Sequence, residues 1–227
     1  MSDAAVGSTT TFLPHVHVQL ALHQLRTGTG RSLLLLHGLG ERTPATLPET
    51  ADAWPGPVYG LDFTGHGAST RAPEGGYTAE VLMADVDTVL AHLGPCTVVG
   101  RGLGAYVALL IAGARPKLVV GAVLCDGPGI AGGGDAPGSP LLTTPPAESI
   151  DPEAPDEIAL VELSRDIRPQ DYAATYARLA LQFSERDLPL SVAAVVRPPW
   201  LAAVVAEPGV ATETLPQALA RYAAVSD

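Results

Sequence analysis

The chain has 227 residues, of which 47% are hydrophobic, so it is long enough for one large domain with a sizeable core. Its formal net charge is −11 and it carries no basic stripe, which excludes nucleic acid and anionic membrane surfaces as expected partners. The N-terminus lacks the pattern of a secretion signal and no apolar run could span a bilayer, so we expect a cytoplasmic protein with reduced cysteines.

The first half of the chain alternates predicted strands with predicted helices. Residues 15–25 have apolar side chains at every second position, which predicts an antiparallel strand with one wet face. Residues 32–40 form an apolar run that ends in glycines, as expected for a strand buried on both faces. Next come a strand and loop at 57–67, a helix at 78–93, a strand at 96–100, a helix at 105–114 and a strand at 117–127. This order predicts the α/β class, with a mostly parallel, doubly wound sheet.

The pattern changes after residue 127, where a turn-rich segment precedes predicted helices at 156–165 and 170–183. Residues 200–209 are predicted to return to the core as a strand, and Thr214 and Gln217 have capping-box spacing before a last helix. The chain is accordingly divided into the first part of the core at 1–130, a helical cap or excursion at 131–195, and a core return at 196–227. We expect this last part to stop short of a final strand.

Three short motifs have the order and spacing of a known family. The sequence HGLG (37–40) follows a buried strand, DFTGHGAS (62–69) follows the next strand, and GRGLG (100–104) joins a strand to a helix. With the two-helix insertion behind them, these motifs resemble the α/β-hydrolase family over most of the chain, roughly residues 14–130 and 195–227. The resemblance implies a sheet of α/β-hydrolase type with a small helical cap insertion. In that family the first motif is the oxyanion loop and the third is the nucleophile elbow.

The resemblance fails at the residues of the catalytic triad. Gly102 stands at the apex of the elbow, where the family has its serine, and glycine relieves a backbone strain that typically costs about 1–3 kcal/mol. The family places its base after the last strand, but no histidine follows His92. Asp126 and Glu207 are the two candidate acids. Without a nucleophile and an imidazole, neither carboxylate can complete a standard triad, so whether the protein is an enzyme stays open.

The motifs that supply the family's oxyanion-binding backbone amides are retained. By resemblance, the amides of Leu39 and Leu103 are the two oxyanion donors. A helix N-terminus bordered by glycines attracts anions, and Arg101 adds a positive charge beside it. We therefore expect a site for a small apolar or carboxylate-bearing ligand under the cap, with no cofactor. Its expected residues are His37, Gly38, Leu39, Arg101, Gly102 and Leu103.

Other candidate side chains have plainer interpretations. His37 is considered as a relocated base, although a histidine at this position more often orients its loop. Cys125 is considered as a displaced nucleophile, although a small buried residue is usual at the end of a strand. His15 and His17 have the spacing of a metal pair but lack further ligands, so no metal site is expected. A dinucleotide fingerprint is rejected because Ala105 stands where its third glycine would be needed.

Three functions remain open. The expected one is a catalytically impaired family member that binds a small molecule. The second is an active, esterase-like hydrolase with an unusual constellation of His37, Asp126 and Cys125. The third is a scaffold or interaction protein, for which an open sheet edge would allow a homodimer. The missing serine and histidine favour the first and third, while the retained loop and elbow favour the first over the third.

Overall fold

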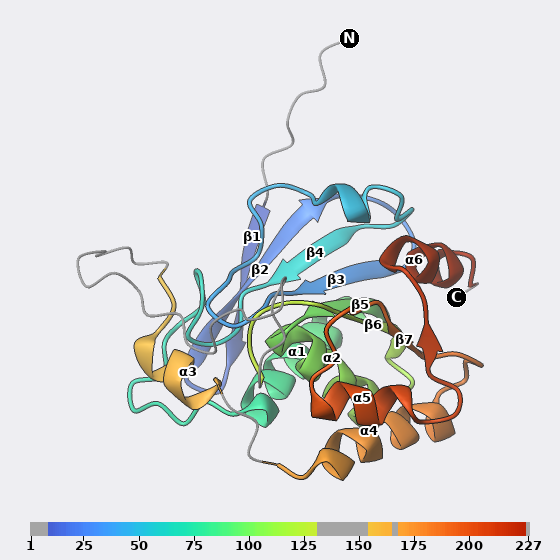
Figure 1. The fold of residues 1–227 in the computed structure, drawn as a ribbon. Helices are drawn as coiled ribbons and strands as arrows, with labels where there is room; N and C mark the ends of the chain where they lie inside the picture. Colours follow the sequence, from blue (N-terminus) through green and yellow to red (C-terminus); the bar gives the residue numbers. More distant parts are fainter. Residues whose placement is uncertain (1–8, 131–153, 165–167, 226–227) are drawn as a thin grey trace.

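The computed structural model describes residues 9–130, 154–164 and 168–225, which build one central sheet with helices on both faces (Figure 1). The strands are β1 (Thr9–His15), β2 (Val18–Arg26), β3 (Ser32–Leu36), β4 (Val58–Leu61), β5 (Cys96–Arg101), β6 (Val119–Cys125), β7 (Leu190–Val192) and β8 (Ala211–Thr212). The helices are the 3₁₀-helix η1 (Glu49–Ala51) and the α-helices α1 (Ala79–Leu93), α2 (Leu103–Ala114), α3 (Glu157–Glu162), α4 (Gln170–Phe183), α5 (Pro199–Val205) and α6 (Leu215–Ala223).

The sheet has eight strands in the order β1-β2-β4-β3-β5-β6-β7-β8. β2 pairs antiparallel with β1 and with β4, and every other neighbouring pair is parallel. This confirms the predicted α/β class with a mostly parallel sheet. The antiparallel strand expected at residues 15–25 corresponds to β2, but β2 begins only at Val18, because His15 ends β1 and a turn at residues 16–17 joins the two strands.

Two apolar cores lie on the two faces of the sheet because alternate strand residues point to opposite sides. Leu34 and Val98 belong to the larger core, which is covered by α1, α2, α4 and α5. Leu33 belongs to the smaller core, where Trp54 follows η1 and Tyr222 comes from α6. The run of leucines in β3 is therefore explained by burial on both faces.

Two expectations for the C-terminal part are wrong. Residues 200–209 contain the helix α5 rather than a strand, and Pro199 stands at its first turn, where a missing N–H costs nothing. Its buried side chains, Trp200, Leu201 and Val204, have helical rather than alternating spacing. The core does not stop short of a final strand, because β8 pairs with β7 at the edge of the sheet.

The two helices expected in the cap lie in different places. α3 lies against the loop after β4, where Asp156 donates its backbone N–H to Gly65 O at 2.8 Å and Tyr77 donates its hydroxyl to Asp156 at 2.6 Å. α4 instead packs on α2, so closely that a Cβ on Gly113 would lie 2.6 Å from the carbonyl oxygen of Tyr176. α4 is thus part of the helical layer over the sheet, and residues 131–153 of the expected excursion lie outside the described residues.

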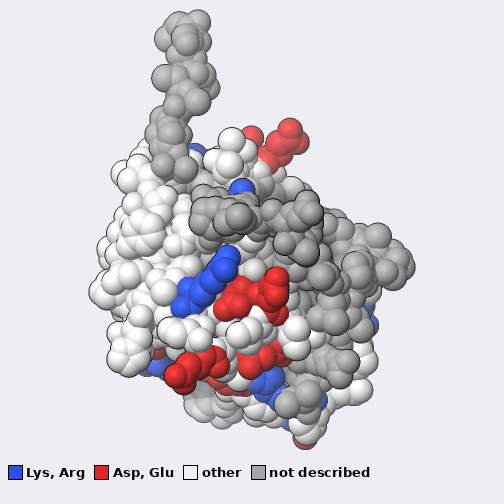
Figure 2. Space-filling model, turned by 90° about the vertical axis from the view of Figure 1, so that its left-hand side faces the viewer, with Lys and Arg blue, Asp and Glu red and all other residues white. Residues whose placement is uncertain are grey.

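The side of the molecule that carries α3 is shown in Figure 2. Acidic side chains gather there beside a few basic ones, and the described residues in view form no continuous basic patch. Arg71 donates a hydrogen bond to the backbone oxygen of Ala154 and so ties the loop after β4 to the segment before α3. The mixed charge is that of an ordinary solvated surface.

A buried carboxyl group supports the loop after β4. Asp85 of α1 is fully buried and accepts hydrogen bonds from the backbone N–H and the hydroxyl of Thr64, both at 2.9 Å. Burial raises the pKa of Asp85 from its ordinary 3.8 to about 7, although both hydrogen bonds act in the opposite direction.

The raised pKa predicts a stability that falls as the pH rises. The folded protein binds the Asp85 proton more tightly than the unfolded chain does. The stabilisation that this proton gives the fold is therefore complete below pH 3.8 and is lost by about pH 7. At pH 8 we expect the free energy of unfolding of Asp85→Asn to exceed that of the parent by up to about 4 kcal/mol. At pH 4 we expect no such gain. Thermal unfolding at both pH values tests this, with Asp87→Asn, a partly exposed carboxylate on the same helix that pairs with Arg115, as the control. An Asp85→Asn effect that is equal at both pH values would contradict it.

Candidate functional site

The turn between β5 and α2 is built without room for a side chain at its apex. Gly102 has φ +53° and ψ −115°, a conformation that residues with a Cβ rarely adopt. A Cβ at this position would lie 2.1 Å from the carbonyl oxygen of Pro128 and 2.4 Å from the carbonyl carbon of Gly127. Glycine at the apex therefore does more than relieve strain, because the backbone of residues 127–128 occupies the space that a side chain would take.

The two amides expected as oxyanion donors do converge on one point. The backbone N–H groups of Leu39 and Leu103 donate to the same oxygen, the carbonyl of Pro128, at 2.9 and 3.0 Å. Two amides directed at one oxygen are the arrangement that stabilises a developing oxyanion in acyl transfer. Here the chain supplies the acceptor itself, so an outside carbonyl or carboxylate oxygen must displace Pro128 before it can use these donors.

The loop of residues 127–130 is packed tightly between the two motifs. A Cβ on Gly38 would lie 2.6 Å from the side chain of Pro128, and one on Gly129 would lie 2.7 Å from the Cβ of Leu39. The next residue, Ile130, is buried and has φ +43°, which is strained for a β-branched residue. Close packing thus holds this loop in place against a local strain in the backbone.

Both ring nitrogens of His37 form hydrogen bonds with the backbone. Its Nδ1 donates to the carbonyl oxygen of Gly38 at 2.7 Å, and its Nε2 accepts the N–H of Phe63 at 3.1 Å. Burial lowers the pKa of His37, and its neighbour His66 has a pKa lowered to about 3, first by burial and then by the charge of His37. A neutral imidazole with both nitrogens occupied orients its loop, and it could act as a base only after losing a backbone hydrogen bond.

The two candidate acids also hold structural contacts. Asp126 accepts hydrogen bonds from the backbone N–H groups of Val195 and Val196, at 2.7 and 2.9 Å. Glu207 forms an ion pair with Arg178 of α4 at 2.6 Å. Within the described ranges, neither carboxylate hydrogen-bonds to a histidine. Asp126 nevertheless lines the same pocket as His37, whereas Glu207 does not.

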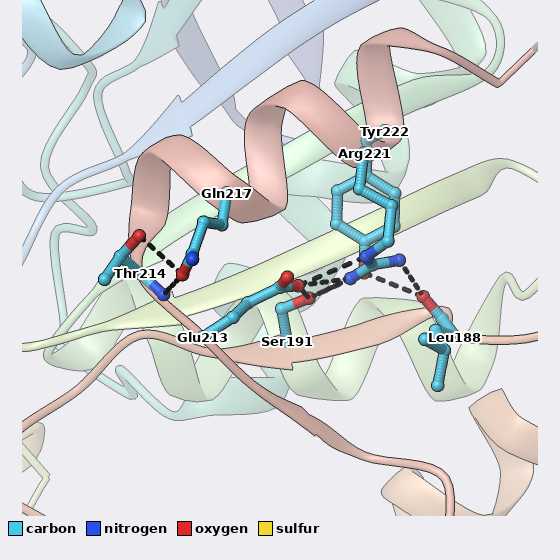
Figure 3. A network of polar contacts seen from close by, with 7 residues as sticks. All are labelled: Leu188, Ser191, Glu213, Thr214, Gln217, Arg221 and Tyr222. Carbon is cyan, nitrogen blue, oxygen red and sulfur yellow. Dashed lines mark hydrogen bonds and ion pairs between the residues drawn. The ribbon is translucent and has the colours of Figure 1, made fainter.

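Glu213, directly after β8, was missed by the sequence analysis and lies in the network shown in Figure 3. It accepts the hydroxyl of Ser191 at 2.7 Å and pairs with Arg221 from the last turn of α6. Burial raises the pKa of Glu213, but hydrogen bonds from Arg221 and Ser191 outweigh burial and hold it below the ordinary value. The next residue, Thr214, forms the predicted capping box with Gln217 at 2.9 Å. The segment after the last strand is thus held to β7 and α6 by an anionic side chain.

A pocket of about 520 Å³ lies next to the occupied donors, on the face of the sheet that carries α6. Its apolar floor includes Leu35 of β3 and Val99 of β5, and Leu215 contributes from the start of α6. Two residues of the expected ligand site, His37 and Arg101, line it. The remaining lining residues are Leu36, Glu41, Arg42, Thr43, Pro44, Pro48, Thr50, Cys125 and Asp126.

Cys125 lines the pocket but is poorly suited to be a nucleophile. Its pKa is raised to about 12, first by burial and then by the charge of Asp126, so the thiol stays protonated at neutral pH. The wall of the pocket is fixed from outside by Asp62, which accepts the N–H of Thr43 at 2.7 Å and binds Nε2 of His23 at 2.9 Å. Burial raises the pKa of Asp62, but these hydrogen bonds outweigh it and lower the value to about 2.

Metal binding and membrane insertion find no structural support in the part of the chain that the structure describes. No group of three or more His, Cys, Asp or Glu side chains is placed there to hold a metal ion. His15 instead binds the hydroxyl of Thr88 at 2.7 Å. None of the described helices is both long and apolar enough to cross a bilayer.

The packing at Gly102 predicts a large loss of stability on adding one methyl group. Gly94 provides a matched control, since it also combines positive φ with negative ψ but has nothing within 4 Å of the place that a Cβ would take. We expect Gly94→Ala to cost about 1–3 kcal/mol from strain alone, and Gly102→Ala to cost at least about 2 kcal/mol more, because it displaces Pro128. Denaturant unfolding measures both, and equal losses would contradict the packing described here.

Comparisons with known proteins agree with this fold. A sequence profile described as "Alpha/beta hydrolase family" matches residues 33–226. The sn-1-specific diacylglycerol lipase ABHD11 of Mus musculus is 36% identical over 84 residues, and this match spans 36% of the chain but only about a quarter (26%) of the mouse protein.

Two solved structures resemble the whole chain. A thioesterase domain from the curacin biosynthetic pathway superposes with a TM-score of 0.64 at 16% identity, over 96% of each chain. A bacterial membrane phospholipase A, described as a virulence factor, superposes with a TM-score of 0.51 at 16% identity, over 93% of this chain and 80% of its own. At these identities the two structures show a shared fold.

Proposed function

We propose that this chain, which belongs to the alpha/beta hydrolase family, binds a small, mainly apolar molecule and does not hydrolyse it. The observation that carries the proposal is the Pro128 carbonyl oxygen, bound by the amides of both Leu39 and Leu103. It fills the position where a substrate carbonyl would have to sit, whereas the pocket lined by the neighbouring residues His37 and Arg101 remains open. A cytoplasmic location is part of the proposal and is supported by two free cysteines.

The proposed lack of hydrolysis rests on three features. Gly102 has no oxygen to attack a carbonyl, and its neighbours leave no room for one. Both nitrogens of His37 are occupied by backbone groups, so His37 does not serve as a general base. The oxyanion donors are already satisfied. An active hydrolase, the alternative suggested by the names of the similar proteins, would need all three features to change together.

Binding is supported by the pocket's size and composition. Its volume of about 520 Å³ is in the range of small-molecule sites, which typically measure about 300–1,000 Å³. Leu35, Val99 and Leu215 give it an apolar interior, while its charged residues offer a few polar contacts. This site lies on the opposite face of the sheet from α2, and so differs from the elbow site expected from the sequence.

A scaffold role in a homodimer is the second candidate and is favoured by one observation. β1 is the outermost strand at one end of the sheet, with an outer edge that pairs with no strand of the described residues. Its Phe12 is 54% exposed. Uncovered edge strands are common sites of pairing between chains. A strict monomer at high concentration in analytical ultracentrifugation would count against this role.

The first test of the proposal is hydrolysis. We expect the purified protein to release p-nitrophenol from short-chain p-nitrophenyl esters no faster than buffer does, because Gly102 carries no nucleophile and both nitrogens of His37 are occupied. Gly102→Ser should remain unlabelled by a fluorophosphonate, because His37 is not placed to activate the new hydroxyl. Saturable turnover that is lost in His37→Ala, or stoichiometric labelling of Gly102→Ser, would instead support the active-hydrolase alternative.

The second test is binding to the pocket. We expect the neutral fluorophore N-phenyl-1-naphthylamine to bind the parent with a rise in emission, and Leu215→Trp to weaken binding about tenfold by filling the pocket. Ala220→Trp adds the same ring on the exposed side of α6 and serves as the control. Fluorescence titration measures all three proteins. Equal affinities of the two variants would place the fluorophore elsewhere.

A further inference from the structure

The side chain of Glu41 is held by three donors at the rim of the pocket. Its Oε2 accepts the backbone N–H of Gly38 at 2.9 Å and Nε of Arg101 at 2.9 Å. Its Oε1 accepts Nη2 of Arg101 at 3.0 Å. A two-pronged guanidinium contact with an added amide is a strong and specific way for a protein to bind a carboxylate.

The amide one residue before Leu39 is bound in the same way as the oxyanion donors, by an acceptor from the chain itself. The N–H of Gly38 is taken by Glu41 and the N–H of Leu39 by Pro128, so neighbouring amides of one loop each hold an acceptor from the chain itself. Gly38 lies between the two acceptors, because a Cβ there would be 2.6 Å from Pro128 and 2.9 Å from Glu41. The loop therefore offers two backbone N–H donors, and each already binds an acceptor from elsewhere in the chain.

Of the two acceptors, Glu41 is the easier one to displace. Its side chain is 34% exposed and that of Arg101 is 40% exposed, and exposed ion pairs contribute little to stability. Pro128, by contrast, is held by tight backbone packing against Gly38 and Gly102. The other carboxylate of the pocket, Asp126, binds the backbone amides of Val195 and Val196 with its two oxygens.

We propose that Arg101 and the Gly38 amide form a carboxylate-binding subsite of the pocket, in which Glu41 stands in for the ligand. A ligand with one carboxylate and an apolar body, such as a medium-chain fatty acid, replaces Glu41 on these donors. Its apolar body then lies on Leu35 and Val99, which line the same pocket as Arg101 and Glu41. This inference rests on the proposed function, since it names the ligand class of that pocket.

The test compares a charged probe with a neutral one of the same chain length. Isothermal titration calorimetry is carried out with octanoate and with octan-1-ol on the parent, Glu41→Ala and Glu41→Ala/Arg101→Met. We expect Glu41→Ala to bind octanoate about fivefold tighter than the parent, because the internal competitor is gone. Arg101→Met should abolish this gain, and octanol should bind the three proteins alike. Glu49→Ala removes another negative charge, at η1, and should leave octanoate binding unchanged.

A second measurement covers the case in which Glu41→Ala is unstable. Acetate should then raise the melting temperature of Glu41→Ala, or of the near-isosteric Glu41→Gln, more than the same concentration of chloride does. The parent and the Arg101→Met variants should show no such difference.

An octanoate affinity that is unchanged in Glu41→Ala, or a gain that survives Arg101→Met, would overturn the subsite while leaving the pocket intact. If octanol and N-phenyl-1-naphthylamine also fail to bind the parent, the proposed function itself fails.

Discussion

The carbonyl oxygen of Pro128 is the point on which the site depends. Two amides from separate motifs, those of Leu39 and Leu103, share it as their acceptor, so it joins the loop after β3 to the start of α2. Such a contact requires backbone to approach backbone closely, which explains the glycines on every side of it. In a water-excluded turn, buried amides without an acceptor would cost about 1–3 kcal/mol each, and Pro128 removes that cost.

The position of residues 127–130 on the donor amides also determines where the open pocket lies. With residues 127–130 seated over the elbow, the open space lies on the other face of the sheet, between the loop of residues 41–50 and the start of α6. Arg101 links the two places, because it precedes the apex glycine while its side chain lines the pocket. The family's framework is thus retained, with glycine at the apex of the elbow and a pocket on the opposite face of the sheet from α2. A fold inherited from hydrolases does not by itself determine an activity.

The sequence predicted the features that depend on local pattern. The strands β2 to β6, the helices α1 and α2, the capping box of Thr214 and the convergence of the two donor amides all follow from periodicity or short motifs, whereas β1 was not expected. It mistook α5 for a strand because a short, continuous apolar run fits a buried helix as well as a buried strand. It missed the role of Pro128 because that contact joins segments some 90 residues apart, through a loop with no periodic pattern.

The space at the apex of the elbow also constrains the history of this sequence. If an ancestor carried a serine at position 102, the loop of residues 127–128 cannot have occupied its present place, since a Cβ there would lie 2.1 Å from the Pro128 oxygen. A serine at this position and the present course of the loop therefore exclude each other. Any side chain at position 102 requires residues 127–128 to shift.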